Sequence, residues 1–205
     1  MKIYGISGLG ADSRVFQYLN LDCEFIPIEW IVPLPNETIE RYAKRLAQCI
    51  DTSQPYVIVG VSFGGVIATE ISKIYVPLAT VLISSVETKY ELRWIYRMVG
   101  KTGIIKLLPD RFFDLPRVFA HWLFGTENKK LLTAILDDTD LSFTKWALDE
   151  LTNWKNETAI NNCIKINGTA DKLIPPTDFN NSFLIKNGGH FMVVDRAAEL
   201  SLIHI

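Results

Sequence analysis

An uninterrupted apolar run ending in a serine between two glycines limits most strongly how this chain can fold. Residues 56–61 read Tyr-Val-Ile-Val-Gly-Val, which is typical of a strand buried on both faces of a sheet. Residues 63–75 then have the pattern of a helix with Gly64 and Gly65 in its first turn, and residues 79–86 form another buried strand. A strand, a helix and a strand in this order predict a right-handed βαβ unit and a parallel sheet.

Four further segments read as strands of the same sheet. Residues 2–7 and 24–30 precede the central unit, and Pro27 places the second of them at an edge, because proline cannot donate a hydrogen bond to a neighbour. Residues 163–167 and 182–186 follow it. The expected fold class is therefore α/β, with a mostly parallel central sheet flanked by helices.

The clearest helix of the expected core covers residues 36–50, where apolar residues recur at helical spacing. Asn36 is a candidate N-cap, and Glu37 and Glu40 suit the first turn. A shorter helix is expected near residues 11–20, and a closing helix from about residue 195.

Residues 87–157 break the alternation of strands and helices. This stretch has several helical segments, no strong strand and four of the five tryptophans. We interpret it as a helical cap inserted into a core made of residues 1–86 and 158–205. It would lie over the carboxyl edge of the sheet, where ligands bind in open α/β folds.

Composition excludes several other classes of protein. A formal net charge of −2 argues against nucleic-acid binding and against a polybasic membrane-binding surface. No apolar run approaches the ~20 residues of a membrane span, and the N-terminus does not resemble a secretory signal. Three widely spaced cysteines without a C-x-x-C pair argue against a disulfide framework or a structural zinc site. The cytoplasm is the expected location.

The segment Gly60-Val61-Ser62-Phe63-Gly64 matches the pattern G-x-S-x-G between a strand and a helix, which is the setting of a nucleophile elbow. In such a turn the Ser62 hydroxyl is exposed above the sheet and the Phe63 N–H points at a developing oxyanion. The alternative is a glycine-rich turn that only permits close packing. No G-x-x-x-x-G-K-[ST] phosphate-binding motif is present.

A serine nucleophile needs a base and an acid that orients the base. Of the three histidines, His190 follows a predicted strand and so reaches the same sheet edge as Ser62; His121 lies in the cap and either packs or lines the pocket, and His204 is the second-last residue. The predicted acid is Asp171, directly after the strand at 163–167. Its rivals are Asp178, which reads as a turn residue, and Asp195, which reads as an N-cap.

The second oxyanion donor is expected from the loop Ser7-Gly8-Leu9-Gly10, which follows the first strand. Its glycines allow the backbone to approach a substrate oxygen closely, and Leu9 N–H is the candidate. A plain turn is the other interpretation of this loop.

With these segments placed, the chain resembles the α/β-hydrolase superfamily along its whole length, and within it the small capped esterases and the plant esterase and hydroxynitrile-lyase group. The resemblance rests on the Gly60–Gly64 elbow, Gly168-Thr169-Ala170-Asp171, Gly189-His190 and a helical cap between strands. It implies a minimal sheet of about six strands. In such proteins the oxyanion loop usually begins with histidine, and here Ser7 stands in that position, which leaves the detailed geometry of the loop open.

The function predicted is hydrolysis of a small carboxylic ester, or a related acyl compound, through an acyl-enzyme on Ser62. Neither a metal nor an organic cofactor is required, and the expected partner is a small molecule with an apolar acyl or aryl part, bound by a monomer or homodimer. Two alternatives stay open: a lyase or C–C-bond hydrolase on the same three residues, and a catalytically inactive binding protein on a hydrolase scaffold.

The cap carries many aromatic residues, and we expect His121, Trp122 and Trp146 to line the substrate pocket. For any single aromatic residue, packing of the cap onto the sheet is the competing interpretation. Lys89, Arg93, Arg97 and Lys101 recur every fourth residue, which predicts one basic helix face. That face is either simply solvated or a site for an acidic substrate.

Overall fold

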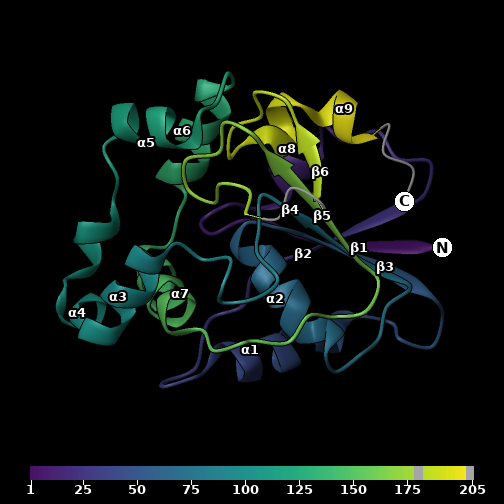
Figure 1. Cartoon of the computed structure of the whole chain (residues 1–205), viewed down its shortest axis with the longest axis horizontal. Helices are drawn as coiled ribbons and strands as arrows, with labels where there is room; N and C mark the ends of the chain where they lie inside the picture. The colour runs from purple at the N-terminus through teal and green to yellow at the C-terminus, as the bar shows by residue number, and fades with distance from the viewer. Residues whose placement is uncertain (178–181, 202–205) are drawn as a thin grey trace.

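The computed structural model describes residues 1–177 and 182–201, which build a parallel sheet with helices on both faces (Figure 1). The sheet has six strands in the order β2-β1-β3-β4-β5-β6, and every neighbouring pair is parallel. The strands are β1 (Lys2–Ile6), β2 (Glu24–Ile28), β3 (Tyr56–Val61), β4 (Ala79–Ile83), β5 (Cys163–Gly168) and β6 (Ser182–Ile185). The predicted parallel α/β sheet is confirmed, and β2, which contains Pro27, lies at one edge.

Strand β3 lies in the interior of the sheet, and all six of its residues are buried. Its alternate side chains enter two separate apolar clusters, with Ile58 in one and Val57 and Val59 in the other. This two-sided burial explains the unbroken apolar run in the sequence, because neither face of the strand reaches water.

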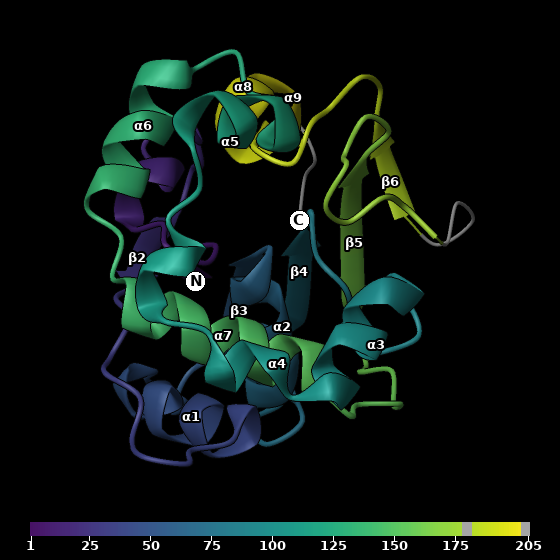
Figure 2. The same ribbon diagram turned by 90° about the vertical axis from the view of Figure 1, so that its left-hand side faces the viewer.

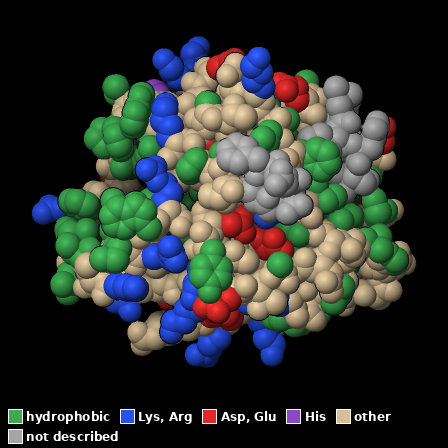
Figure 3. Space-filling view, in the orientation of Figure 1, with side chains coloured by type: hydrophobic (Ala, Val, Ile, Leu, Met, Phe, Trp, Pro, Cys, Tyr) green, Lys and Arg blue, Asp and Glu red, His purple; other side chains and the backbone are tan. Residues whose placement is uncertain are grey.

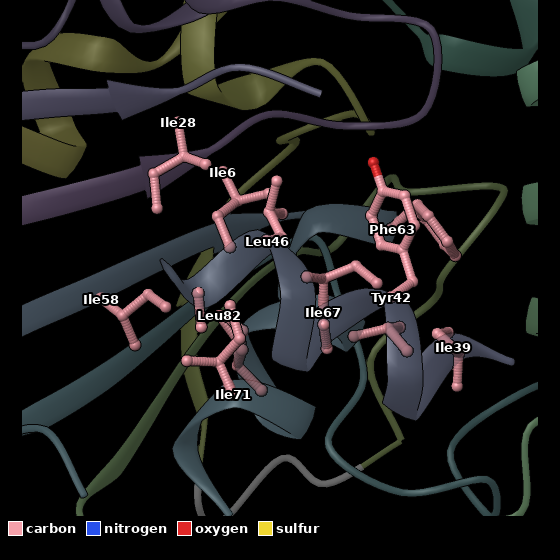
Figure 4. Close-up of a cluster of buried hydrophobic side chains, with 14 of the residues drawn as sticks. Ile6, Ile28, Ile39, Tyr42, Leu46, Ile58, Phe63, Ile67, Ile71 and Leu82 are labelled. Atoms are coloured by element: carbon pink, nitrogen blue, oxygen red, sulfur yellow. The ribbon is translucent and has the colours of Figure 1, made fainter. Parts of the chain in front are cut away.

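One face of the sheet is covered by α1 (Ile39–Leu46), the 3-10 turn η2 (Ala47–Cys49) and α2 (Phe63–Ser72). Their apolar side chains, among them Tyr42 and Ile67, pack against Ile58 and Leu82 of the strands (Figure 4). Tyr42 is fully buried, and its hydroxyl donates to the Ile31 carbonyl at 2.8 Å and accepts from the Ile31 N–H at 3.1 Å.

The start of α1 differs from the prediction. The N-cap is Thr38, whose side chain accepts a hydrogen bond from Arg41 N, and not Asn36. Asn36 has a φ of 55° and forms a turn before the helix. The turn is held by Glu37, whose carboxylate accepts from Leu34 N and Arg45, so the chain enters the helix two residues later than expected.

The opposite face is covered by η1 (Ser13–Phe16), α8 (Met192–Asp195) and α9 (Ala197–Ser201), which pack into the second cluster. The helix expected near residues 11–20 is only this single 3-10 turn, capped by Asp12. The closing helix begins at Met192, three residues before the expected start. Asp195 is therefore not an N-cap: its carboxylate accepts from Glu127 N and Asn128 N.

Between β4 and β5 the chain forms six helical segments. They are α3 (Trp94–Thr102), α4 (Ile104–Leu107), η3 (Asp110–Phe113), α5 (Arg117–Phe124), α6 (Lys129–Asp137) and α7 (Leu141–Asn153). The stretch 87–157, all of which is described, contains no strand. In Figure 2, α5 and α6 lie on one side of the strand ends and α3, α4 and α7 on the other.

The inserted helices are packed on the core at both faces of the sheet. Trp146 of α7 packs against Tyr42 of α1 with ring centroids 4.5 Å apart, and Trp154 donates from Nε1 to the buried Glu70 of α2 at 2.8 Å. Leu132 and Ile135 of α6 join the cluster on the opposite face. That residues 87–157 act as a distinct cap stays a prediction. In the described part of the chain, none of the helices has the length and apolar character needed to cross a bilayer.

Candidate active site

Ser62 lies in a strained turn between the end of β3 and the start of α2. Its φ and ψ of 53° and −122° are uncommon for a residue with a side chain. The turn is held by hydrogen bonds from Ser62 N to the Ile83 carbonyl at 2.9 Å and from Ser85 Oγ to the Ser62 carbonyl at 2.6 Å. This geometry makes Ser62 the last residue before the helix and leaves its hydroxyl partly accessible.

The glycines around Ser62 are required by close backbone contacts. A Cβ at Gly60 would lie 2.4 Å from Gly65 Cα, and a Cβ at Gly64 would lie 2.2 Å from the carbonyl oxygen of Ser7. The helix therefore packs directly against the end of β1, which brings the loop after β1 beside Ser62.

His190 links Ser62 to Asp171. Its Nε2 lies 2.8 Å from Ser62 Oγ, and its Nδ1 lies 2.8 Å from Asp171 Oδ2. The Asp171 side chain has no exposed surface and that of His190 is 4% exposed. Because a carboxylate only accepts, Nδ1 carries the proton and Nε2 is free to accept from the serine hydroxyl.

The Asp171 carboxylate is held by its own loop. Its second oxygen, Oδ1, accepts from Leu173 N and Ile174 N at 2.9 Å each. Tyr96 of α3 donates to the Leu173 carbonyl at 3.0 Å, and burial raises the pKa of this phenol, which keeps it a donor. The acid is thus presented by a short turn that an inserted helix also supports.

The loop that carries His190 is clamped against α5. A Cβ at Gly189 would lie 2.8 Å from the Phe124 carbonyl oxygen, and Phe191 N donates to that oxygen at 3.3 Å. The Phe124 ring also meets the His190 ring edge-on at a centroid distance of 5.5 Å. The end of α5 therefore fixes the orientation of the imidazole.

The predicted oxyanion loop lies against the serine. A Cβ at Gly8 would come within 3.4 Å of Ser62 Cβ and 4.0 Å of Ser62 Oγ. Neither Leu9 N nor Phe63 N donates to an acceptor among the described residues, so both N–H groups remain available to a ligand oxygen.

Three residues that hold this backbone were not identified from the sequence. Trp30 Nε1 donates to the Ala11 carbonyl at 3.0 Å, and Thr139 Oγ1 donates to the Gly10 carbonyl at 2.9 Å. The third is Ser85, whose hydroxyl donates to the Ser62 carbonyl. Each comes from a distant part of the chain and belongs to no local motif, so no sequence signal pointed to them.

The three residues predicted to line a pocket have different surroundings. His121 Nε2 lies 2.9 Å from Thr133 Oγ1 of α6, and Trp122 is 58% exposed and stacks on Phe119. Trp146 contacts the Phe63 ring and donates from Nε1 to the Glu37 carbonyl at 2.9 Å. Trp146 therefore attaches α7 to the core, which agrees with the packing interpretation.

Asp178 and His204 lie outside the described residues. Of the basic repeat, Lys89 pairs with Glu157, Arg93 donates to the Lys172 carbonyl at 3.1 Å, and Lys101 is exposed. Within the described ranges no group of three His, Cys, Asp or Glu side chains is arranged to hold a metal ion.

A cavity of about 230 Å³ opens beside the predicted oxyanion loop. It is lined by three stretches of the chain together with Phe143, namely residues 10–12, 30–33 and 138–140. Since Trp30 and Thr139 both line it and both bond the loop, a ligand there would touch the groups that hold the loop in place.

No protein-family model and no curated protein matches this sequence. Solved structures do match it over almost its whole length. A lipase-esterase related protein from Clostridium acetobutylicum ATCC 824 superposes with a TM-score of 0.68 at 16% identity, covering 98% of this chain and 91% of the other. The chain has the α/β-hydrolase fold.

Two other α/β-hydrolase structures illustrate the range of matches. MenH from S. aureus superposes with a TM-score of 0.70 at 16% identity, covering 98% of this chain and 90% of the other. A malate-bound thermophilic esterase from Thermogutta terrifontis gives 0.67 at 14% identity, with 98% and 86% covered. At such identities the likeness is one of fold, and the chemistry has to be argued from the residues of this chain.

Proposed function

We propose that this protein is a serine hydrolase that cleaves a small carboxylic ester, or a related acyl compound, through an acyl-enzyme on Ser62. The observation that carries the proposal is the hydrogen-bonded chain Ser62–His190–Asp171, with the Phe63 and Leu9 N–H groups free beside the serine. Esterases and lipases among the proteins of similar fold agree with this activity.

In the proposed reaction, His190 Nε2 takes the proton of Ser62 as Oγ attacks the ester carbonyl carbon. The carbonyl oxygen becomes an oxyanion that accepts from Phe63 N and Leu9 N. His190 then gives its proton to the leaving alcohol, which breaks the ester bond and leaves an acyl-Ser62. Water, deprotonated by His190, attacks this acyl group and releases the acid.

Asp171 keeps the proton of the neutral imidazole on Nδ1 and stabilises the imidazolium that forms in both steps. We assign residues 87–157 the role of a cap, because Phe124 of α5 contacts His190 and Phe143 of α7 packs on Phe63. The apolar surroundings of these contacts favour a substrate with an apolar acyl or aryl part.

The test is turnover of p-nitrophenyl acetate and butyrate by the purified protein, beside Ser62→Ala and His190→Ala. We expect each variant to lose at least about 10³-fold in kcat/KM. Ser53→Ala, which removes an exposed hydroxyl far from the site, is the matched control and should retain full activity.

A fluorophosphonate probe separates the alternatives if these esters are not cleaved. Labelling that disappears in Ser62→Ala would show a live nucleophile with a more selective substrate, or with lyase or C–C-bond chemistry. Absence of labelling from a folded protein would refute the serine-hydrolase proposal and favour a binding protein on this fold.

A further inference from the structure

Exposed apolar side chains are concentrated on the inserted helices α3, α4 and α5 and on the turn η3. Figure 3 shows them gathered along the side of the molecule where these helices lie, with Lys and Arg side chains between them. The residues that define this apolar patch are Trp94, Met98, Leu107, Phe112, Val118 and Trp122, each at least half exposed. Monomeric proteins rarely expose so many large apolar side chains together unless the surface binds something.

The same segment is strongly basic. Residues 93–122 contain six Lys or Arg and two Asp, a formal charge of +4 in a chain whose total is −2. The overall charge therefore conceals a local excess of positive charge. Arg93, Lys101 and Arg111 form no ion pair with any residue that the structure describes, so their charge is available to a partner.

We propose that the apolar patch and the cations around it form a docking surface for an anionic lipid bilayer. Aromatic and aliphatic side chains would enter the headgroup region, while Lys and Arg would contact the lipid phosphates. Trp and basic residues with long apolar stems suit such an interface because each has an apolar body and a polar tip.

The charge and shape of the patch argue against other occupants. A second copy docking by the same face would bring the cations Arg93, Lys101 and Arg111 of one copy against those of the other. A protein partner would be anchored by side chains that fit pockets in the surface, and the residues of the patch line neither the cavity at residues 10–12, 30–33 and 138–140 nor the one between Tyr18 and residues 127–130. A bilayer requires no such complementarity.

The patch is also joined to the candidate active site. Lys172, which follows Asp171 in the chain, donates from Nζ to the Trp122 carbonyl at 2.6 Å and lies 4.6 Å above the Trp122 ring. Arg93 donates to the Lys172 carbonyl. Docking by this surface would therefore place the loop that carries Asp171 at the lipid boundary, where amphipathic esters are found.

Co-sedimentation of the purified chain with vesicles tests the proposal. Equimolar phosphatidylglycerol and phosphatidylcholine should pellet the protein at about 50 mM salt, much less so at about 500 mM salt, and pure phosphatidylcholine should bind it weakly. A blue shift of tryptophan fluorescence should accompany binding, since Trp94 and Trp122 are exposed.

The double variant Leu107→Glu/Val118→Glu changes two side chains that are 84% and 83% exposed, so it should fold normally. We expect its partition into anionic vesicles to fall about tenfold or more. The matched control is Val76→Glu/Leu78→Glu, which adds the same charge at exposed positions before β4, at the opposite end of the sheet, and should bind as wild type does.

Three results would overturn the proposal. They are no preference of the wild type for anionic vesicles, binding by Leu107→Glu/Val118→Glu equal to that of the wild type, or a wild-type dimer that this double variant abolishes. The last would identify a second copy as the occupant. The proposal does not depend on the hydrolase activity. Turnover of soluble p-nitrophenyl butyrate, measured on every variant, reports separately on the chemistry.

Discussion

The hydroxyl of Ser7 donates a 2.7 Å hydrogen bond to the carbonyl oxygen of Ala11, four residues along the chain. The Trp30 indole donates to the same oxygen, and Ala11 N donates to the Gly8 carbonyl at 3.0 Å. Together these bonds engage the Gly8 and Ala11 carbonyl groups, while the Leu9 N–H donates to no acceptor among the described residues. Ser7 thus closes the loop at the position where histidine is usual in the esterases that the sequence resembles.

Ser7→Ala should lower kcat for p-nitrophenyl butyrate about tenfold with little change in KM, because the loop would hold the oxyanion donor less accurately. Trp30→Phe should have a similar effect. The double variant should lose more than the product of the two single effects, since the Ala11 carbonyl then has no side-chain donor. Full activity in a folded double variant would show that these bonds do not position the oxyanion donor.

Asp171→Asn should reduce kcat by about 10⁴-fold while the protein stays folded. The asparagine oxygen would still accept from Leu173 N and Ile174 N, which turns its NH₂ group toward His190 Nδ1. His190 would then carry its proton on Nε2 and could not accept from Ser62. Steady-state kinetics measures the loss, and circular dichroism checks the fold; a decrease of less than tenfold would contradict the assigned role.

Gly64→Ala should destabilise the protein by about 3 kcal/mol or more, because the new methyl group would lie 2.2 Å from the Ser7 backbone oxygen, which directly follows β1 and cannot move freely. Gly103→Ala is the matched control. Gly103 has a φ of 65° and nothing within 4 Å of its added Cβ, so only the left-handed backbone strain remains, about 1 kcal/mol. Urea unfolding compares the two, and equal losses would disprove the steric argument.

Lowering the pH should destabilise the turn before α1, because the Glu37 carboxylate that holds this turn becomes protonated. Hydrogen bonds from Arg45 hold the pKa of this carboxyl below its usual 4.5 in the folded state. A lowered folded-state pKa stabilises the protein above the unfolded value, and this stabilisation is lost as the pH falls from about 5 toward 3. Glu37→Gln should therefore cost about 1–3 kcal/mol at pH 7.

The diagnostic measurement is how the stability difference between wild type and Glu37→Gln depends on pH. The gap in unfolding free energy between wild type and Glu37→Gln should shrink as the pH is lowered through this range. Glu40 is an exposed carboxylate in the first turn of α1 without an ion pair among the described residues, so Glu40→Gln should leave the curve unchanged. A gap that is constant from pH 7 to pH 3 would contradict the role of the Glu37–Arg45 pair.

Several site residues could be proposed from the sequence because their local setting is decisive. A buried strand, a G-x-S-x-G turn and a helix place Ser62 at the carboxyl edge wherever a parallel sheet forms. His190 and Asp171 each follow a strand of the same sheet, so parallel topology alone brings them to the same edge. The structure adds that His190 lies within hydrogen-bonding distance of both Ser62 and Asp171.

Other expectations were wrong where side-chain contacts outweighed local preference. Asn36 has a good N-cap side chain, but the pairing of Glu37 with Arg45 moves the helix start to Ile39. Asp195 precedes helical residues, but its carboxylate bonds Glu127 N and Asn128 N from the inserted segment. In both cases the carboxylate is bound by a group outside its own turn, the Arg45 guanidinium in one case and backbone N–H groups of the inserted segment in the other.

By itself, then, the sequence determined the order of strands and helices and the turn that exposes Ser62, because apolar periodicity and glycine placement act over a few residues. Only the tertiary structure decided that Trp30, Thr139 and Ser85 hold the backbone around the serine, since folding brings each of them there from another segment of the chain. It also decided that the apolar and basic residues of α3, α4 and α5 share one surface. Contacts between distant segments leave no periodic trace in a chain, which is why they become visible only after folding.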